Sequence, residues 1–142
     1  MKIKTRKVDV ILNDKLIKKD FEIPEFWSDR AATIVGSKYA MDYENSALDI
    51  INRVVNQITI WGGEQGYFSE GGKQKEHAEC FNKDLKDILI NQRASFNSPV
   101  WFNCGVPANV NQMSACFIFT VEDNMEDILD HVKREGMVFK SG

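Results

Sequence analysis

The stretch Ser114-Ala-Cys-Phe-Ile-Phe-Thr-Val121 decides the class of fold expected for this 142-residue chain. From Ala115 to Val121 both alternating sets of side chains are mainly apolar, which predicts a strand buried on both faces of an α/β sheet or barrel. Asp123 follows with Glu126 three residues later, a variant of the capping box that starts a helix. A strand followed directly by a helix is half of a βαβ unit. No second strong strand follows, so the pattern predicts a fold that is cut short.

Helical stretches on both sides of this strand carry apolar residues three and four positions apart. Ser28 is a good N-cap for the first, which we expect to reach Tyr39. Gly62-Gly63 is expected to end the second, and the third continues to about Gln92. The apolar face of the second stretch comprises Leu48, Ile51, Val55 and Ile58, and that of the third comprises Ala78, Phe81, Leu85 and Ile88. The helix after the strand carries Met125, Ile128, Leu129 and Val132. The second stretch carries Asp49, Asn52, Arg53 and Asn56 on its polar side.

These patterns divide the chain into three parts. Residues 1–24 are expected to form a short hairpin or an extended arm, because apolar residues alternate from Val8 to Leu12 and Asn13-Asp14 supplies a turn. Residues 25–95 are predicted to form a mainly helical domain. An apolar, loop-like run begins after Arg93, so residues 96–142 are expected to start a second domain.

Composition excludes several classes of protein. Hydrophobic residues make up 43% and charged residues 27% of the chain, as in folded proteins. The formal net charge of −3 is too small to recruit nucleic acid through its phosphates. No apolar run approaches the roughly 20 residues that cross a bilayer, and no signal core follows the N-terminal lysines, so we expect a cytoplasmic protein without a membrane partner.

The three cysteines, Cys80, Cys104 and Cys116, form no CxxC pair and have no histidine at a metal-ligand spacing. We therefore expect no metal site and no disulfide scaffold. From spacing alone each is best interpreted as an inert cysteine, and Cys116 as a core residue. A redox-sensing thiol at Cys116 is the least favoured hypothesis, because its apolar neighbours Phe117 and Ile118 do not favour a reactive thiolate.

One longer pattern goes beyond composition. Arg93-Ala-Ser-Phe-Asn-Ser-Pro-Val-Trp-Phe-Asn103, followed by Ser114-Ala-Cys-Phe-Ile118, resembles the N-terminal part of class II, adenosylcobalamin-dependent ribonucleotide reductases of the longer form. Further matching residues lie at Ile23–Ser28, Val35–Tyr39, Trp61–Gly62, Gln65–Phe68, Val121–Asp123 and Glu135–Lys140. The resemblance implies an α+β fold, in which a mainly helical N-terminal domain precedes the first strand and helix of a ten-stranded α/β barrel, here truncated.

The resemblance also implies a reaction. In that family adenosylcobalamin generates a thiyl radical that takes the 3′ hydrogen of a ribonucleotide, the 2′ hydroxyl leaves as water, and two strand cysteines become a disulfide. Cys116 matches the first of these two, and its partner and the cobalamin-binding surface would lie outside this chain. A thiol held on a rigid strand is suited to this role. A thioredoxin-like reductant would restore the thiols.

The remaining matched positions concern ligands and subunits. Ser98, Pro99 and Val100 match a loop beneath the substrate, and Ser114 and Ala115 match a turn beside the reducing cysteine. Asp123 matches an acidic residue that contacts the ribose of a deoxynucleotide effector. The helix over residues 124–135 matches one that packs against a partner subunit in a homodimer. Simpler interpretations are a plain turn at residues 97–99, a helix N-cap at Asp123 and an ordinary core face on the helix.

Two functional hypotheses follow. In the first, the chain is part of a ribonucleoside diphosphate or triphosphate reductase and is active only with the C-terminal remainder of that protein. By itself it would expose a strand edge and the apolar face of its last helix, which predicts self-association. In the alternative, it is a non-catalytic interaction module that binds reductase subunits or nucleotide.

Overall fold

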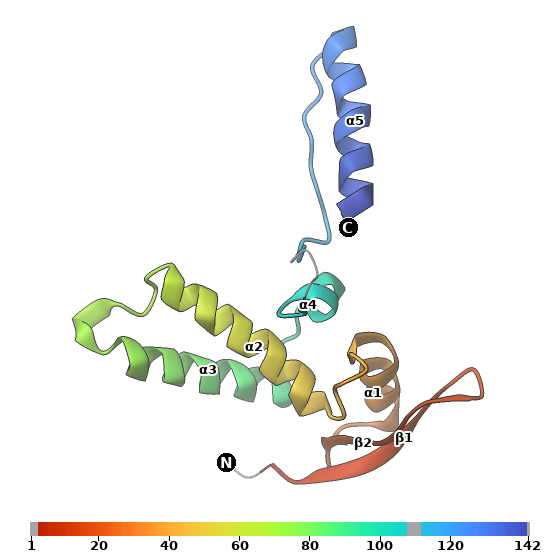
Figure 1. Cartoon of the computed structure of the whole chain (residues 1–142), viewed down its shortest axis with the longest axis vertical. Helices are drawn as coiled ribbons and strands as arrows, with labels where there is room; N and C mark the ends of the chain where they lie inside the picture. Colours follow the sequence, from red (N-terminus) through yellow and green to blue (C-terminus); the bar gives the residue numbers. More distant parts are fainter. Residues whose placement is uncertain (1–2, 108–111, 142) are drawn as a thin grey trace. The chain divides into compact units, whose positions relative to one another are not determined.

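A computed structural model of the chain describes residues 3–107 and 112–141. It combines helices with a two-stranded antiparallel sheet, which confirms a mixed α and β fold (Figure 1). The chain divides into two compact units, residues 1–95 and 96–142, and each has its own internal contacts.

The first unit begins with a β-hairpin. Strand β1 (Thr5–Leu12) pairs with the antiparallel strand β2 (Lys15–Pro24). Asn13 and Asp14 join them with φ angles of 50° and 60°, the left-handed conformation that tight hairpin turns require. Of the two expected alternatives, a hairpin or an extended arm, the structure shows the hairpin. The end near the helices buries Val10, Phe21 and Ile23, whereas the end near the turn is exposed.

Helix α1 (Asp29–Ile34) packs on the hairpin and continues as the π-helix η1 (Val35–Tyr39). The predicted N-cap is confirmed, since the Ser28 hydroxyl accepts a hydrogen bond of 3.1 Å from the amide of Ala31. A Cβ atom on Gly36 would lie 2.6 Å from Cγ2 of Val10. Only glycine therefore allows η1 to approach the strand this closely.

Helices α2 (Ala47–Glu64) and α3 (Gln74–Ile90) lie side by side and are joined through the 3₁₀ turn η2 (Glu70–Gly72) (Figure 1). Both helices were predicted from their apolar spacing. The expected end of the second at Gly62-Gly63 is wrong, because both glycines belong to the last turn of α2. Gly62 instead gives room to the Phe68 ring, which a Cβ would approach to 2.9 Å.

The polar side of α2 is partly buried at Arg53. Arg53 lies against Glu44, with 2.8 Å between Nε and Oε1, and their side chains are only 7% and 3% exposed. The other carboxylate oxygen of Glu44 accepts from the amide of Met41 at 2.8 Å. A buried ion pair is tolerated when further hydrogen bonds satisfy its atoms. The ion pair therefore holds the loop before α2 against the helix.

Trp27, just before α1, contacts the C-terminal end of α3. Its indole nitrogen donates a hydrogen bond of 2.8 Å to the carbonyl of Ile90, and the side chain is buried. Ile90 is the last residue of α3, where carbonyl groups have no partner within the helix. The hydrogen bond therefore connects two segments of the first unit that are far apart in the sequence.

The second unit contains the short helix α4 (Ser98–Asn103) and the long helix α5 (Met125–Ser141). The run after Arg93 was expected to be loop-like, but Pro99 lies in the first turn of α4, where its fixed φ angle favours a helix. The strand expected from Ala115 to Val121 is not formed, because those residues are extended without a neighbouring strand. Among the described residues the paired strands are β1 and β2.

Candidate functional site

The three residues expected beneath a substrate, Ser98, Pro99 and Val100, form the first turn of α4. Ser98 is exposed, Pro99 is half-buried and Val100 is buried. The amide of Val100 donates to the carbonyl of Asn97 at 3.2 Å, so it is already engaged. The turn is followed by Trp101, whose indole donates to the carbonyl of Phe96 at 3.0 Å. The simple turn interpretation is therefore replaced by a helix start that an aromatic side chain supports.

The residues Ser114, Ala115 and Cys116 lie on an extended, exposed segment between α4 and α5. The segment is connected to the end of α4 because Nδ2 of Asn103 donates to the carbonyl of Gln112 at 2.6 Å. The side-chain oxygen of Gln112 in turn accepts from the amide of Ser114 at 2.9 Å. These contacts hold the start of the Cys116 segment beside the end of α4.

The thiol of Cys116 is exposed, so the structure does not place it in a core as spacing alone suggested. Cys104 is fully buried, while Cys80 is exposed on α3. The carboxylate of Asp84 accepts a hydrogen bond of 3.5 Å from the Cys80 thiol. This hydrogen bond, together with the negative charge of Asp84, raises the pKa of Cys80. Cys80 is therefore a poor nucleophile despite its exposure.

Asn124 caps helix α5, which corrects the expected cap at Asp123. The side-chain oxygen of Asn124 accepts from the amide of Asp127 at 2.9 Å. The carboxylate of Asp127 reaches back to the amide of Glu122 at 2.6 Å. The cap therefore lies one residue after the expected one, and the returning carboxylate bonds the amide two residues before the cap. Asparagine caps a helix as well as aspartate does. Asp123 is exposed and makes no hydrogen bond or ion pair with a described residue.

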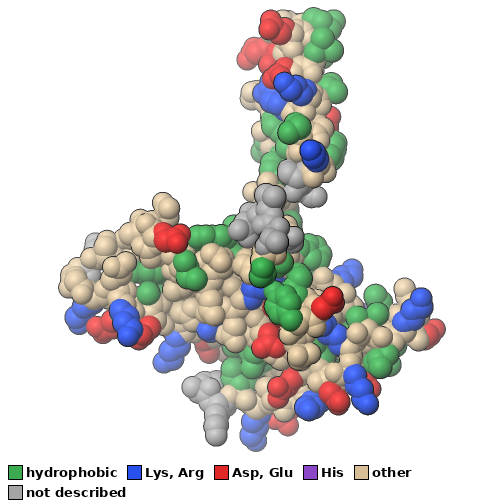
Figure 2. All heavy atoms as spheres, viewed as in Figure 1, with side chains coloured by type: hydrophobic (Ala, Val, Ile, Leu, Met, Phe, Trp, Pro, Cys, Tyr) green, Lys and Arg blue, Asp and Glu red, His purple; other side chains and the backbone are tan. Residues whose placement is uncertain are grey.

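Apolar side chains are exposed along α5 and the segment before it (Figure 2). The segment packs back on the helix through the edge contact of Phe119 with His131, whose ring centroids are 5.7 Å apart. Ile118 is nevertheless 94% exposed. The other exposed apolar residues are Phe117, Val121, Met125, Ile128, Leu129, Val132, Met137 and Phe139. The expected exposure of the last helix's apolar face is confirmed, and such a surface is typical of an interaction site.

The described residues offer neither a group of metal ligands nor a membrane-spanning helix. Within residues 3–107 and 112–141, no group of three or more histidine, cysteine or acidic residues is placed to hold a metal ion. In the same residues, no helix is both long and apolar enough to cross a membrane.

The chain was compared with protein families, curated proteins and solved structures. No family model matches the chain, and no solved structure does. A vitamin B12-dependent ribonucleotide reductase of Streptomyces coelicolor is 45% identical over 127 residues, which cover 85% of this chain. The protein of the same name from Streptomyces clavuligerus is 44% identical over 127 residues. The one from Rhodopirellula baltica is 35% identical over an alignment of 157 residues, which includes 87% of this chain.

The matches cover only part of these relatives. The chain spans 13% of the length of the two Streptomyces proteins and 15% of the Rhodopirellula protein. Over most of its own length, this chain is therefore similar to one segment of proteins named vitamin B12-dependent ribonucleotide reductases.

Proposed function

We propose that this chain is the N-terminal part of a cytoplasmic ribonucleotide reductase that makes deoxyribonucleotides with the help of adenosylcobalamin. The observation that carries the proposal is the 45% identity over 85% of the chain to a protein of that name. Because the chain spans 13% of that relative, catalysis requires the C-terminal remainder of the reductase. Adenosylcobalamin supplies the radical that starts the reaction and binds to that remainder.

The role we assign to Cys116 is that of a reductant. The C2′–O bond of the ribonucleotide breaks, its oxygen leaves as water, and a new C2′–H bond forms. The two electrons come from Cys116 and a second cysteine outside this chain, which become a disulfide. A thioredoxin-like protein then reduces the disulfide. The exposure of Cys116 supports this role, since no described side chain blocks a partner thiol.

The substrate and effector contacts are assigned to the same unit. Ser98, Pro99 and Val100, with Ser114 and Ala115, are proposed to contact a ribonucleoside diphosphate or triphosphate. The connection of Gln112 to Asn103 supports this, because it keeps the segment beside α4. Asp123 is proposed to contact the ribose of a deoxynucleotide effector, and its exposed carboxylate is available for that contact.

Helix α5 is proposed to pack against its counterpart in a homodimer or against the rest of the barrel. Its apolar face supports such a contact, because Leu129 and Val132 are 63% and 61% exposed and would be removed from water in an interface. Burying apolar area provides about 25 cal/mol per Å². The strand expected from Ala115 to Val121 would then acquire its neighbours from the remainder of the protein.

Reconstitution tests this proposal. The chain is co-expressed with the part of the Streptomyces coelicolor reductase that lies outside the matched region, and deoxyribonucleotide formation is measured with adenosylcobalamin and a dithiol. We expect activity from the pair and none from either piece. Cys116→Ser should abolish turnover in this assay, whereas the matched control Cys80→Ser, another exposed cysteine, should retain it. Full activity of the Cys116→Ser pair would refute the assigned role.

A non-catalytic interaction module is the second candidate, and the exposed face of α5 favours it. Such a module would bind reductase subunits or nucleotide without taking part in turnover. It would inhibit an intact reductase when added in excess and would not restore activity to the remainder. Cys116→Ser would leave that inhibition unchanged, which separates the two candidates.

A further inference from the structure

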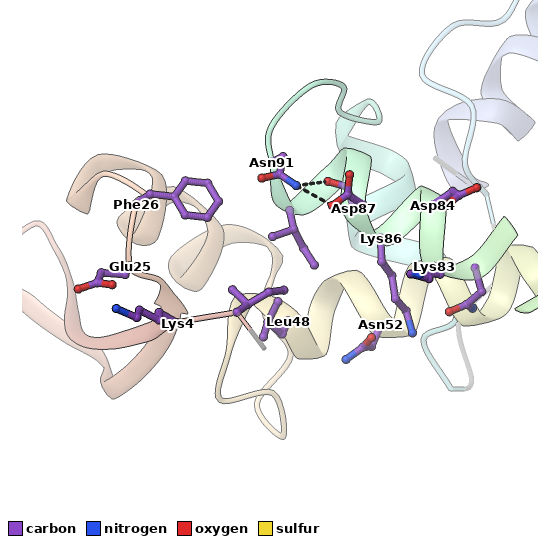
Figure 3. A pocket seen from close by; sticks show the side chains of 13 residues that line it. Lys4, Glu25, Phe26, Leu48, Asn52, Lys83, Asp84, Lys86, Asp87 and Asn91 are labelled. Atoms are coloured by element: carbon purple, nitrogen blue, oxygen red, sulfur yellow. Dashed lines mark hydrogen bonds between the residues drawn. The ribbon is translucent and has the colours of Figure 1, made fainter. Parts of the chain in front are cut away.

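The first unit contains a groove that the proposed function does not use. Its volume is about 870 Å³, within the range of about 300–1,000 Å³ typical of small-molecule sites. The groove is lined by residues just before β1, in the β2–α1 connection, in α2 and in the second half of α3 (Figure 3). All of them belong to residues 1–95, so the groove is a property of one compact unit.

An aromatic ring and aliphatic side chains form the apolar part of the groove. Phe26 is 58% exposed, and Figure 3 shows its ring directed into the groove. Leu48 from α2 and Ile90 from α3 line the groove as well. An exposed phenylalanine beside aliphatic side chains suits the flat face of an aromatic ligand.

The cationic groups of the groove have no acidic partner of their own. Lys4, Lys83 and Lys86 line it, and none forms an ion pair with a described residue. Asp87, by contrast, lies 3.4 Å from Nη1 of Arg93 and accepts a hydrogen bond of 2.9 Å from the side chain of Asn91.

Three carboxylates, those of Glu25, Asp84 and Asp87, line the groove as well, so the formal charges of its lining are balanced in number. Asp84 accepts from the Cys80 thiol, which leaves Glu25 as the lining carboxylate without a hydrogen bond or ion pair to a described side chain. Two of the three carboxylates are thus engaged by other side chains, whereas the three ammonium groups form no ion pair with a described residue. Cations along a partly enclosed wall raise the local concentration of anions.

We propose that this groove binds a small organic anion with an aromatic body. Its ring packs on Phe26, and its acidic group meets the ammonium groups, above all that of the half-buried Lys86. Lys86 and Asn52 extend into the groove from α3 and α2, so an ammonium and an amide are both available to an acidic oxygen (Figure 3). The site involves neither Cys116 nor α5, so its failure would leave the proposed reductase role untouched.

Phenyl phosphate is the probe for this site, added to the full ¹⁵N-labelled chain and followed by NMR. We expect saturable shifts of the amides of Phe26, Asn52 and Lys86. Phe26→Leu, which keeps an apolar side chain, and Lys86→Gln should each weaken binding about fivefold or more. The control Lys75→Gln, on the same helix with a side chain that is 91% exposed and outside the groove, should bind as the natural chain does.

Two further ligands make the test decisive. Inorganic phosphate offers charge without a ring, and benzyl alcohol offers a ring without charge, so both should bind at least about tenfold more weakly. Equal affinity for either one, equal affinity of the Lys86→Gln and natural chains, or shifts scattered over α5 would overturn the proposal. Well-dispersed spectra of the variants check that each remains folded.

Discussion

The first unit of this chain buries many of its apolar side chains, whereas those along α5 in the second unit are mostly exposed. Ile50 in α2 is 2% exposed, whereas Ile118 before α5 is 94% exposed. The first unit has a hairpin and two long helices whose apolar faces meet. In the second unit, a single long helix and an extended segment carry apolar residues that remain exposed. Apolar sequence therefore becomes a core only where a facing surface is present, and elsewhere it is available to a partner.

The same contrast appears in the ion pairs. Arg53 in the first unit pairs with Glu44, and both side chains are buried. Arg134 in α5 pairs with Asp127 at 2.8 Å, but those side chains are 37% and 27% exposed. Solvent screens the second pair, whereas the first has little water to replace a lost partner. A matched pair of substitutions therefore tests the comparison directly.

Arg53→Met is expected to have the largest effect on the free energy of unfolding. It leaves the carboxylate of Glu44 buried and without its cation, which costs about 3–5 kcal/mol. Arg134→Met should cost at most about 1 kcal/mol, because its partner remains hydrated. Urea unfolding followed by circular dichroism measures both. Similar losses in the two variants would show that the units do not differ as described.

The cap of α5 provides a finer comparison within the second unit. Asn124→Ala removes the acceptor of the Asp127 amide and should destabilise α5 by about 1 kcal/mol. Asp123→Ala, one residue earlier, removes no described hydrogen bond and should change the helix little. Hydrogen exchange of the α5 amides reports on both. If Asp123→Ala increased exchange more than Asn124→Ala, the cap would be misassigned.

Much of the first unit could be predicted because its signals are local. The spacing places Ile51 and Val55 on the buried face of α2, although Leu48 is only half-buried. Asn13-Asp14 predicts the hairpin turn. The burial of Arg53 could not be predicted in this way, because it depends on Glu44 in a separate loop. Periodicity identifies a face of a helix but not what the chain brings against the other face. The groove beside Phe26 was missed for the same reason, since four segments build it.

The second unit shows the opposite failure. The residues from Ala115 to Val121 have the composition of a buried strand, yet a strand requires a neighbour to pair its backbone groups. Sequence pattern describes the environment that a segment suits, and that environment is not formed by the described residues. The assignments of Cys116, Ser98 and Asp123 came from resemblance to a family, because spacing alone favoured a core cysteine, a turn and a cap.

The smallest expected effect concerns the two exposed cysteines, one in each unit. Asp84 raises the pKa of Cys80 through a hydrogen bond and its charge. A raised pKa lowers the thiolate fraction at any pH below it, and only the thiolate is alkylated. Asp84→Asn removes the charge, so the pKa should fall and alkylation of Cys80 by iodoacetamide should become about two- to fivefold faster near pH 8.

The pH dependence and two controls make this prediction specific. Well above the pKa both forms of Cys80 are fully ionised, so the difference between Asp84→Asn and the natural chain should disappear there. Glu79→Gln removes a neighbouring carboxylate that lies near Lys75 and should leave the rate unchanged. The rate at Cys116 should be the same in all three chains, because Asp84 lies on α3 in the other unit. Equal acceleration at both cysteines would mean that the substitution loosens the fold, and the influence of Asp84 on Cys80 would then not be local.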